Sequence, residues 1–251
     1  MFSSHDAYVW LLVATVFALA GVVKGVIGLG LPTLSMALLA LWMPPADAAA
    51  LLIVPSLVTN VWQLRPWPAI GPIARRLGGM QVGIVAGTFA GTWWLGTPSG
   101  AWPVVTLGLA LTAYAAWGWM GRAVRTPPAS ERWLGPLAGA VTGALTAVTG
   151  VFVIPAVVYL QALGLSRDAL IQAMGLSFTV STLALAVALV GQNAYSTPLA
   201  AASVAMLVPA LCGMAAGQWV RSRLSVLLFR RSFFAGLAML GIYMVMRELQ
   251  S

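Results

Sequence analysis

The chain has 251 residues, of which 61% are hydrophobic and only 7% are charged, and its net charge is +8. So few polar side chains cannot cover the surface of a soluble protein of this size. The arginines lie in short loops between apolar runs, as positive charge does in membrane proteins. The net positive charge is therefore explained without nucleic-acid binding. These features predict an all-α, polytopic membrane protein.

Ten apolar segments follow one another, and each is expected to be a helix because lipid offers no partner for an unpaired backbone group. They span roughly 8–28, 31–43, 47–64, 78–96, 102–121, 135–149, 151–164, 168–190, 198–219 and 232–249. Several are shorter than the ~20 residues of a full span. The pairs 8–28/31–43 and 135–149/151–164 are therefore predicted to be broken or re-entrant hairpins.

Charge predicts the orientation of these segments. Eleven of the twelve arginines follow the third, fifth, seventh and ninth segments, and only Arg247 lies on the other side. Because short cytoplasmic loops carry the positive charge of membrane proteins, both termini are expected to face the periplasm or exterior. The loop around Arg125, with its two prolines, is expected to be a cytoplasmic linker.

The chain also contains an internal repeat. A-G-V-V-K-G-V-I around Gly21 is echoed by A-G-A-V-T-G-A-L around Gly139, and Ser56 is echoed by Ser177. A third echo pairs Gly79, Gly83, Gly87 and Gly91 with Ala205, Pro209, Gly213 and Gly217. Five segments per copy is an odd number, so the copies should be inverted, as in many secondary transporters. The predicted division is 1–121 (first inverted repeat), 122–134 (cytoplasmic linker) and 135–251 (second inverted repeat).

Lys24 is the strongest candidate for a substrate-binding residue. It is the only lysine and lies in an apolar run near the end of the first segment. Ionisable groups within a membrane usually line a cavity or pathway, and a cation would favour an anionic substrate. The alternative is that its side chain extends to the cytoplasmic interface.

Two predicted helix breaks could supply further ligands. The first is G-L-G-L-P, with Gly28 and Gly30 before a proline suited to the first turn of a new helix. The free N–H groups of that helix would attract an oxyanion. The second break, T-A-V-T-G, offers Thr146, Thr149 and Gly150. We expect the breaks to face each other near the midplane, although each could also be a tight bend without a ligand.

Matched polar residues on the third and eighth segments complete the candidate site. They are Ser56, Thr59 and Asn60 on one segment and Ser177 and Ser181 on the other. Neutral hydroxyls and amides can coordinate an oxyanion, but such residues also form hydrogen bonds between membrane helices.

Other residues are given structural roles. Asp47 and Asp168 are predicted N-caps, the glycine ladder is expected to pack helices closely, and Cys212 is expected to be a buried thiol. The tryptophans near segment ends are expected at the membrane interfaces. No metal site or cofactor is predicted. The single histidine, His5, lies in the tail, which argues against a Ser–His hydrolase.

The glycine run from Gly21 to Gly30 before Pro32, and its echo from Gly139 to T-G-V-F-V-I-P, resemble the TauE/SafE sulfite exporter family. The likeness spans nearly the whole chain, although T-A-V-T-G interrupts the second run and Pro55 and Leu176 flank the serines. The resemblance implies a bacterial inner-membrane carrier that exports small sulfur-containing anions such as sulfite or organosulfonates.

The leading hypothesis is therefore a secondary transporter with alternating access around a midplane site between the repeats. Its expected partners are a small anionic substrate and the lipid bilayer. An uncoupled, channel-like anion pathway and a non-transporting membrane scaffold are the alternatives, and no oligomeric state is predicted.

Overall fold

The computed structural model describes residues 7–96, 100–120, 125–221, 223 and 225–250. Across these residues the chain is all-helical, with eleven α-helices, two short 3₁₀-helices and no strand. His5 and Arg122, to which the sequence assigned roles, lie outside the described residues.

The helices follow the predicted segments closely. The first part of the chain forms α1 (Ala7–Ile27), α2 (Leu31–Leu39), α3 (Pro45–Trp62), η1 (Trp67–Ala69), α4 (Ile70–Arg76), α5 (Gly78–Leu95) and α6 (Trp102–Met120). The remainder forms η2 (Pro128–Ser130), α7 (Glu131–Thr149), α8 (Ala156–Ala162), α9 (Arg167–Gly191), α10 (Thr197–Arg221) and α11 (Val226–Gln250). Each of the ten predicted segments corresponds to one of these helices, whereas α4 was not predicted.

Six helices in the described part of the chain are long and apolar enough to cross a membrane: α1, α3, α6, α9, α10 and α11. In contrast, α2 has 9 residues and α8 has 7. At 1.5 Å per residue they extend only about 14 Å and 10 Å, well short of the ~30 Å hydrocarbon core. Unlike these six helices, α2 and α8 are therefore too short to cross the membrane.

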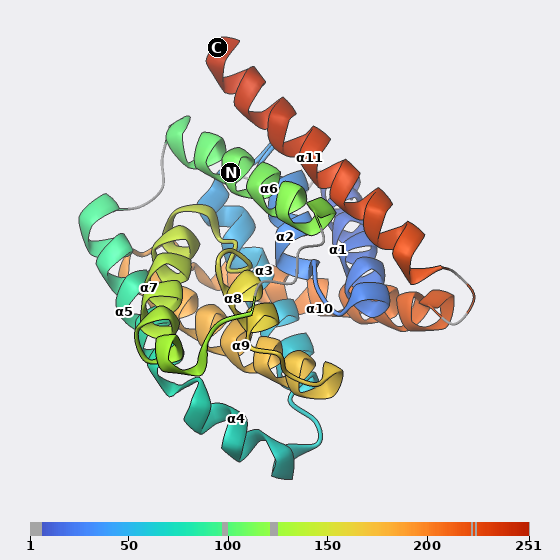
Figure 1. The fold of residues 1–251 in the computed structure, drawn as a ribbon. Helices are drawn as coiled ribbons and strands as arrows, with labels where there is room; N and C mark the ends of the chain where they lie inside the picture. Colours follow the sequence, from blue (N-terminus) through green and yellow to red (C-terminus); the bar gives the residue numbers. More distant parts are fainter. Residues whose placement is uncertain (1–6, 97–99, 121–124, 222, 224, 251) are drawn as a thin grey trace.

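The helices pack in pairs that join distant parts of the sequence (Figure 1). Helix α5 packs along α7, and α1 packs along α10. Helices α3 and α9 contact each other at the centre, and α6 packs along α11. Each of these four pairs takes one helix from before residue 122 and one from after it.

Glycines bring α5 and α7 to backbone contact. A side chain on Gly83 would overlap the carbonyl oxygen of Pro136, and one on Gly87 would overlap that of Ala140. Small residues at four-residue spacing allow this close approach in membrane helices. The prediction that the ladder packs helices is confirmed.

The same contacts occur between α10 and α1. A side chain on Gly213 would overlap the carbonyl oxygen of Ala18, and one on Gly217 would overlap that of Val22. In the sequence echo, Ala18 and Val22 correspond to Pro136 and Ala140 of α7, whose carbonyl oxygens lie against Gly83 and Gly87. By these contacts, Gly87 of α5 corresponds to Gly217 of α10. The sequence echo had instead aligned Gly87 with Gly213, which lies one helical turn earlier.

Helix α3 contains Pro55, and α10 compensates for it. Proline has no N–H to donate to the carbonyl of Leu51, four residues earlier. The Ser203 hydroxyl of α10 donates to Leu51 O at 2.9 Å and accepts from Val54 N at 3.0 Å. Ser203 is fully buried, so it stabilises the centre of α3 from a neighbouring helix.

We expect Ser203→Ala to lower the free energy of unfolding by about 1–3 kcal/mol, because it leaves the buried Leu51 carbonyl unpaired. Ser232→Ala, on the exposed surface of α11, is the matched control and should have little effect. Denaturant titration in detergent micelles measures both, and equal stability of the two variants would contradict the role given to Ser203.

Several sequence predictions were wrong in detail. Asp47 and Asp168 lie in the first turns of α3 and α9, but Pro44 and Ser166 occupy the N-cap positions. Ser166 accepts a hydrogen bond from Ala169 N at 3.3 Å, so a hydroxyl caps α9 instead of the neighbouring carboxylate.

Two further corrections concern boundaries and burial. Cys212 is exposed and is not the buried thiol that the sequence predicted. Helix α7 begins at Glu131, four residues before the start of the predicted segment 135–149.

Candidate functional site

Lys24 lies one turn before the end of α1 and is 3% exposed. Its ammonium donates a hydrogen bond to Oδ1 of Asn60 on α3. The side chain therefore turns inward and does not extend to the surface.

A chain of hydrogen bonds continues from Lys24 to α9. Asn60 is fully buried, and its Nδ2 donates to Thr182 Oγ1 at 3.5 Å. Within the described residues no carboxylate lies at ion-pair distance from Lys24. Because a buried ammonium is costly without a negative partner, this position is suited to an anion that arrives from outside the protein.

Lys24 forms part of the wall of a cavity of about 810 Å³, which we call the lysine cavity. Its polar and charged lining residues are Lys24, Gln63, Arg65, Ser166, Asp168, Gln172, Gln218 and Arg221. Arg65 and Asp168 are exposed, so the cavity opens toward the ends of α3 and α10 and the start of α9. Its three cations outnumber its single carboxylate.

Glutamines fix the backbone around this cavity. Gln63 Nε2 donates to Gly28 O at 2.7 Å, which holds the break between α1 and α2 against the end of α3. Gln172 Nε2 donates to Leu64 O at 3.1 Å and to Pro66 O at 3.0 Å. The Gln63 Oε1 atom is buried without a partner among the described residues.

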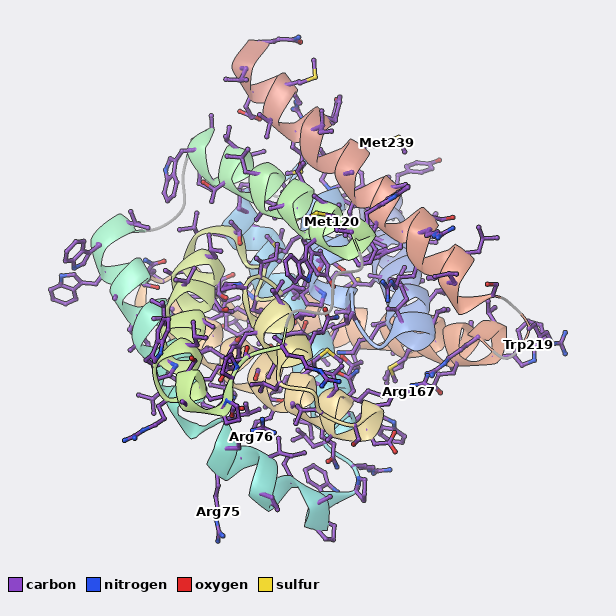
Figure 2. The ribbon with its side chains drawn as sticks, in the orientation of Figure 1. Arg75, Arg76, Met120, Arg167, Trp219 and Met239 are labelled. Carbon is purple, nitrogen blue, oxygen red and sulfur yellow. The ribbon has the colours of Figure 1, made fainter. Side chains whose placement is uncertain are left out.

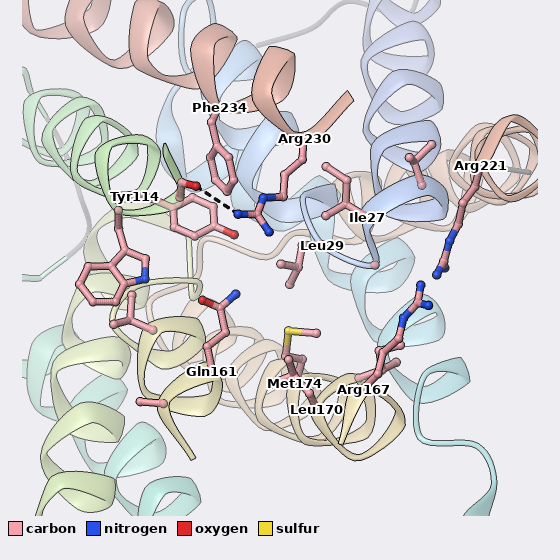
Figure 3. Close-up of a pocket in the computed structure, with 17 residues that line it drawn as sticks. Ile27, Leu29, Tyr114, Gln161, Arg167, Leu170, Met174, Arg221, Arg230 and Phe234 are labelled. Atoms are coloured by element: carbon pink, nitrogen blue, oxygen red, sulfur yellow. Dashed lines mark hydrogen bonds between the residues drawn. The ribbon is translucent and has the colours of Figure 1, made fainter. Parts of the chain in front are cut away.

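A second cavity of about 410 Å³, the arginine cavity, shares Gly28, Ile171 and Arg221 with the first. Arg167 and Arg230 line it as well, and Figure 3 shows its residues. Guanidinium groups bind oxyanions through paired N–H donors. The two cavities together form a cationic, water-accessible region on one side of the molecule.

The family model for the sulfite exporter TauE/SafE matches residues 13–244, nearly the whole chain. The chain belongs to the TauE/SafE family. Neither a curated protein nor a solved structure matches it. As a TauE/SafE protein it is a multi-pass membrane transporter of anionic substrates and not an enzyme.

In this TauE/SafE protein the residues predicted from the first helix break lie near Lys24. Gly28 lines both cavities. Gly30 has φ 108°, a left-handed conformation that favours glycine, and directly precedes α2. The first residues of α2 are buried and do not line either cavity.

The second break has different neighbours. A side chain on Gly150 would meet Met36 of α2 and Ala49 near the start of α3, whereas Gly28 contacts Gln63 just after the end of α3. Positions 49 and 63 are about 21 Å apart along a helix. The contacts therefore do not bring the two breaks together as the sequence analysis expected.

The hydroxyls of the second break are already paired. Thr146 Oγ1 donates to Thr142 O and Thr149 Oγ1 to Leu145 O, both at 2.7 Å. Such bonds to the preceding turn are common for threonine in helices. Neither threonine lines the two cavities.

The central pair α3 and α9 holds the remaining candidates, all of them fully buried. Thr59 Oγ1 donates to Pro55 O at 2.7 Å, and Ser177 Oγ accepts from Gln81 Nε2 at 3.0 Å. Ser56 Oγ and Ser181 Oγ have no hydrogen-bond partner among the described residues. Because buried hydroxyls are normally paired, these two are unused donors on the helices that carry Asn60 and Thr182.

Sequence reasoning missed the arginines of the cavities. Arg65, Arg167 and Arg221 were used only to orient the protein. Each lies at or just beyond the end of a long helix, and helix ends on the same side of a bundle converge. That position was the available signal, but it does not separate arginines that line a cavity from those that face solvent.

Arg76 and Glu131 form the one ion pair found among the described residues, outside the six candidate spans. Arg76 donates to the carboxylate at 2.9 and 2.6 Å, and its Nη2 also lies 3.3 Å from Leu163 O. Hydrogen bonding to Arg76 holds the pKa of Glu131 below its ordinary value. The pair joins the end of α4 to the start of α7 and the end of α8.

Proposed function

We propose that the protein is a secondary transporter that exports small sulfur-containing anions, of the sulfite or organosulfonate type, by alternating access. The observation that carries this proposal is the buried, carboxylate-free Lys24 at the wall of a cationic cavity. A sulfonate or sulfite oxygen would accept from its ammonium in place of, or together with, Asn60.

The proposed site consists of Lys24, Gly28 and Asn60 next to the cavity, with Ser56 and Ser181 as further donors. The two serine hydroxyls are unpaired and buried on the helices that meet at the centre. They would become ligands when α3 and α9 move slightly apart. Thr59 and Ser177 lie on the same helices, whereas Gly30, Thr146, Thr149 and Gly150 would support the short helices.

The recurring helix contacts support two inverted repeats, residues 1–121 and 135–251. Under this proposal α1, α2, α3, α5 and α6 correspond in order to α7, α8, α9, α10 and α11. The two-fold symmetry that relates the repeats then converts the pair α1/α10 into the pair α7/α5. It converts the pairs α3/α9 and α6/α11 each into the same pair of helices. Inverted repeats of this kind commonly enclose a substrate site between them.

The same contacts suggest which parts move. Because the glycine contacts of α1 with α10 and of α5 with α7 are backbone to backbone, each pair would move as one body. Each body contains one helix from each repeat. We therefore propose that access alternates by rocking of these mixed pairs around α3 and α9, and not by separation of whole repeats.

The position of the cavity and the arginines supports export as the direction of transport. The lysine cavity opens among Arg65 and Arg221, on the side that the positive-inside rule assigns to the cytoplasm. Both termini would then face the periplasm of a bacterial inner membrane. In this arrangement the substrate enters from the cytoplasm and is exported.

The test is flux of sulfite, sulfate and ethanesulfonate from proteoliposomes, with glucose and choline as controls. A carrier gives selective efflux that saturates with substrate concentration and is accelerated by the same anion on the opposite side. Flux that rises linearly and shows no such exchange would favour the channel-like alternative. No anion flux from folded protein would contradict transport of these substrates.

A further inference from the structure

The arginine cavity contains two arginines, Arg167 and Arg230, that do not line the lysine cavity, and it shares Arg221 with that cavity. Arg167 from the start of α9, Arg221 from the end of α10 and Arg230 from α11 all line it, and none of its lining residues is Asp or Glu. Figure 3 shows the guanidinium groups of Arg167 and Arg221 pointing toward each other. Like charges that face each other repel unless an anion lies between them.

The rest of the cavity wall is fixed. Arg230 Nη2 donates to Gly118 O at 3.4 Å, and its guanidinium lies 5.9 Å from the ring centroid of Phe234. Phe234 in turn packs edge-on against Tyr114. In contrast, Arg167 and Arg221 have no hydrogen-bond or ion-pair partner among the described residues, so their donors are free to bind a ligand.

Polar groups suited to oxygen ligands complete the site. The side chain of Gln161, at the end of α8, points into the cavity (Figure 3). Its amide could donate to an anion held by the guanidinium pair. The volume of about 410 Å³ accommodates a small anion with water.

We propose that Arg167 and Arg221, with Gln161 and Arg230, form a second anion site that prefers a doubly charged oxyanion of the sulfate type. Three guanidinium groups favour a dianion over a monoanion, whereas the proposed Lys24 site has one cation, the lysine itself. This site rests on the proposed transport function and would be the position at which substrate first binds. Gly28, which lines both cavities, lies between the two sites.

Equilibrium binding of radiolabelled sulfate to purified protein in nanodiscs tests this proposal. We expect Arg167→Gln/Arg221→Gln to weaken one class of sulfate binding by about tenfold or more, since two charged hydrogen-bond donors are removed. Arg75→Gln/Arg231→Gln is the matched control. It removes the same charge from two exposed arginines that line neither cavity and should bind sulfate as the wild type does.

The lipid composition distinguishes a free anion from a lipid headgroup. Nanodiscs of phosphatidylcholine should show sulfate binding at this site, and addition of phosphatidylglycerol should leave it unchanged if the ligand is a free anion. Displacement of sulfate by phosphatidylglycerol would assign the site to a lipid phosphate and overturn its role in substrate capture.

Two results separate this inference from the proposed function. If the Arg167/Arg221 variant binds sulfate like the wild type while anion flux persists, the second site is wrong and the transporter assignment stands. If sulfate binds at the arginines but no sulfur anion is transported, the transport proposal fails and the binding site stands.

Discussion

Replacement of Lys24 with Met is expected to reduce anion flux by about 30-fold or more, because a charged hydrogen bond to the substrate is lost in a buried site. Met has a similar length and removes only the charge and its donors. Lys24→Arg keeps the charge and should retain part of the flux. Initial rates of sulfite efflux from proteoliposomes measure both variants.

The Lys24→Met protein should fold at least as well as the wild type. Its ammonium is buried with Asn60 as its only polar partner among the described residues, and an apolar residue of similar volume in place of a buried charge is often neutral or stabilising. Lost flux with unchanged or higher stability would therefore indicate a substrate-binding role.

Arg75→Met is the control for the loss of a cation, since Arg75 is exposed, points away from the molecule (Figure 2) and lines neither cavity. Its flux should equal that of the wild type. Wild-type flux through the Lys24→Met protein would show that Lys24 does not bind the substrate.

The helical fold could be predicted because the hydrocarbon core constrains the backbone so strongly. Every apolar segment became a helix, and the glycine ladder packed as expected. Helix α4 was missed because it has only seven residues, two of them arginines, and therefore too short an apolar run. The apolar run 151–164 indicated a short segment, but α8 is shorter still, since α7 ends at Gly150 and the next helix begins only after Pro155.

The candidate site was predicted only in part. An isolated lysine in an apolar run indicated Lys24 directly, and its bond to Asn60 joins two residues that the sequence had singled out separately. The expectation that Gly150 faces the first helix break was wrong. The echo between the repeats shows which residues correspond, but it does not show how far apart they lie. Arg167 and Arg221 could not be assigned, since a cavity depends on side-chain direction at helix ends.

The largest effect on stability is expected at the glycine contacts. Gly87→Ala places a methyl group on the carbonyl oxygen of Ala140, and neither backbone can move without separating α5 from α7. We expect the free energy of unfolding to fall by about 3 kcal/mol or more, at the upper end of the cost of overpacking. Gly217→Ala should act likewise on α10 and α1, where the added methyl meets Val22.

Gly236→Ala is the matched control, because Gly236 lies inside α11 with open space around its Cα. Alanine favours helix over glycine by about 1 kcal/mol, so this variant should be neutral or slightly more stable. Denaturant titration in micelles compares the three proteins. If Gly87→Ala and Gly236→Ala unfold at the same denaturant concentration, α5 and α7 are not held at backbone contact, and the proposal that they move as one body loses its basis.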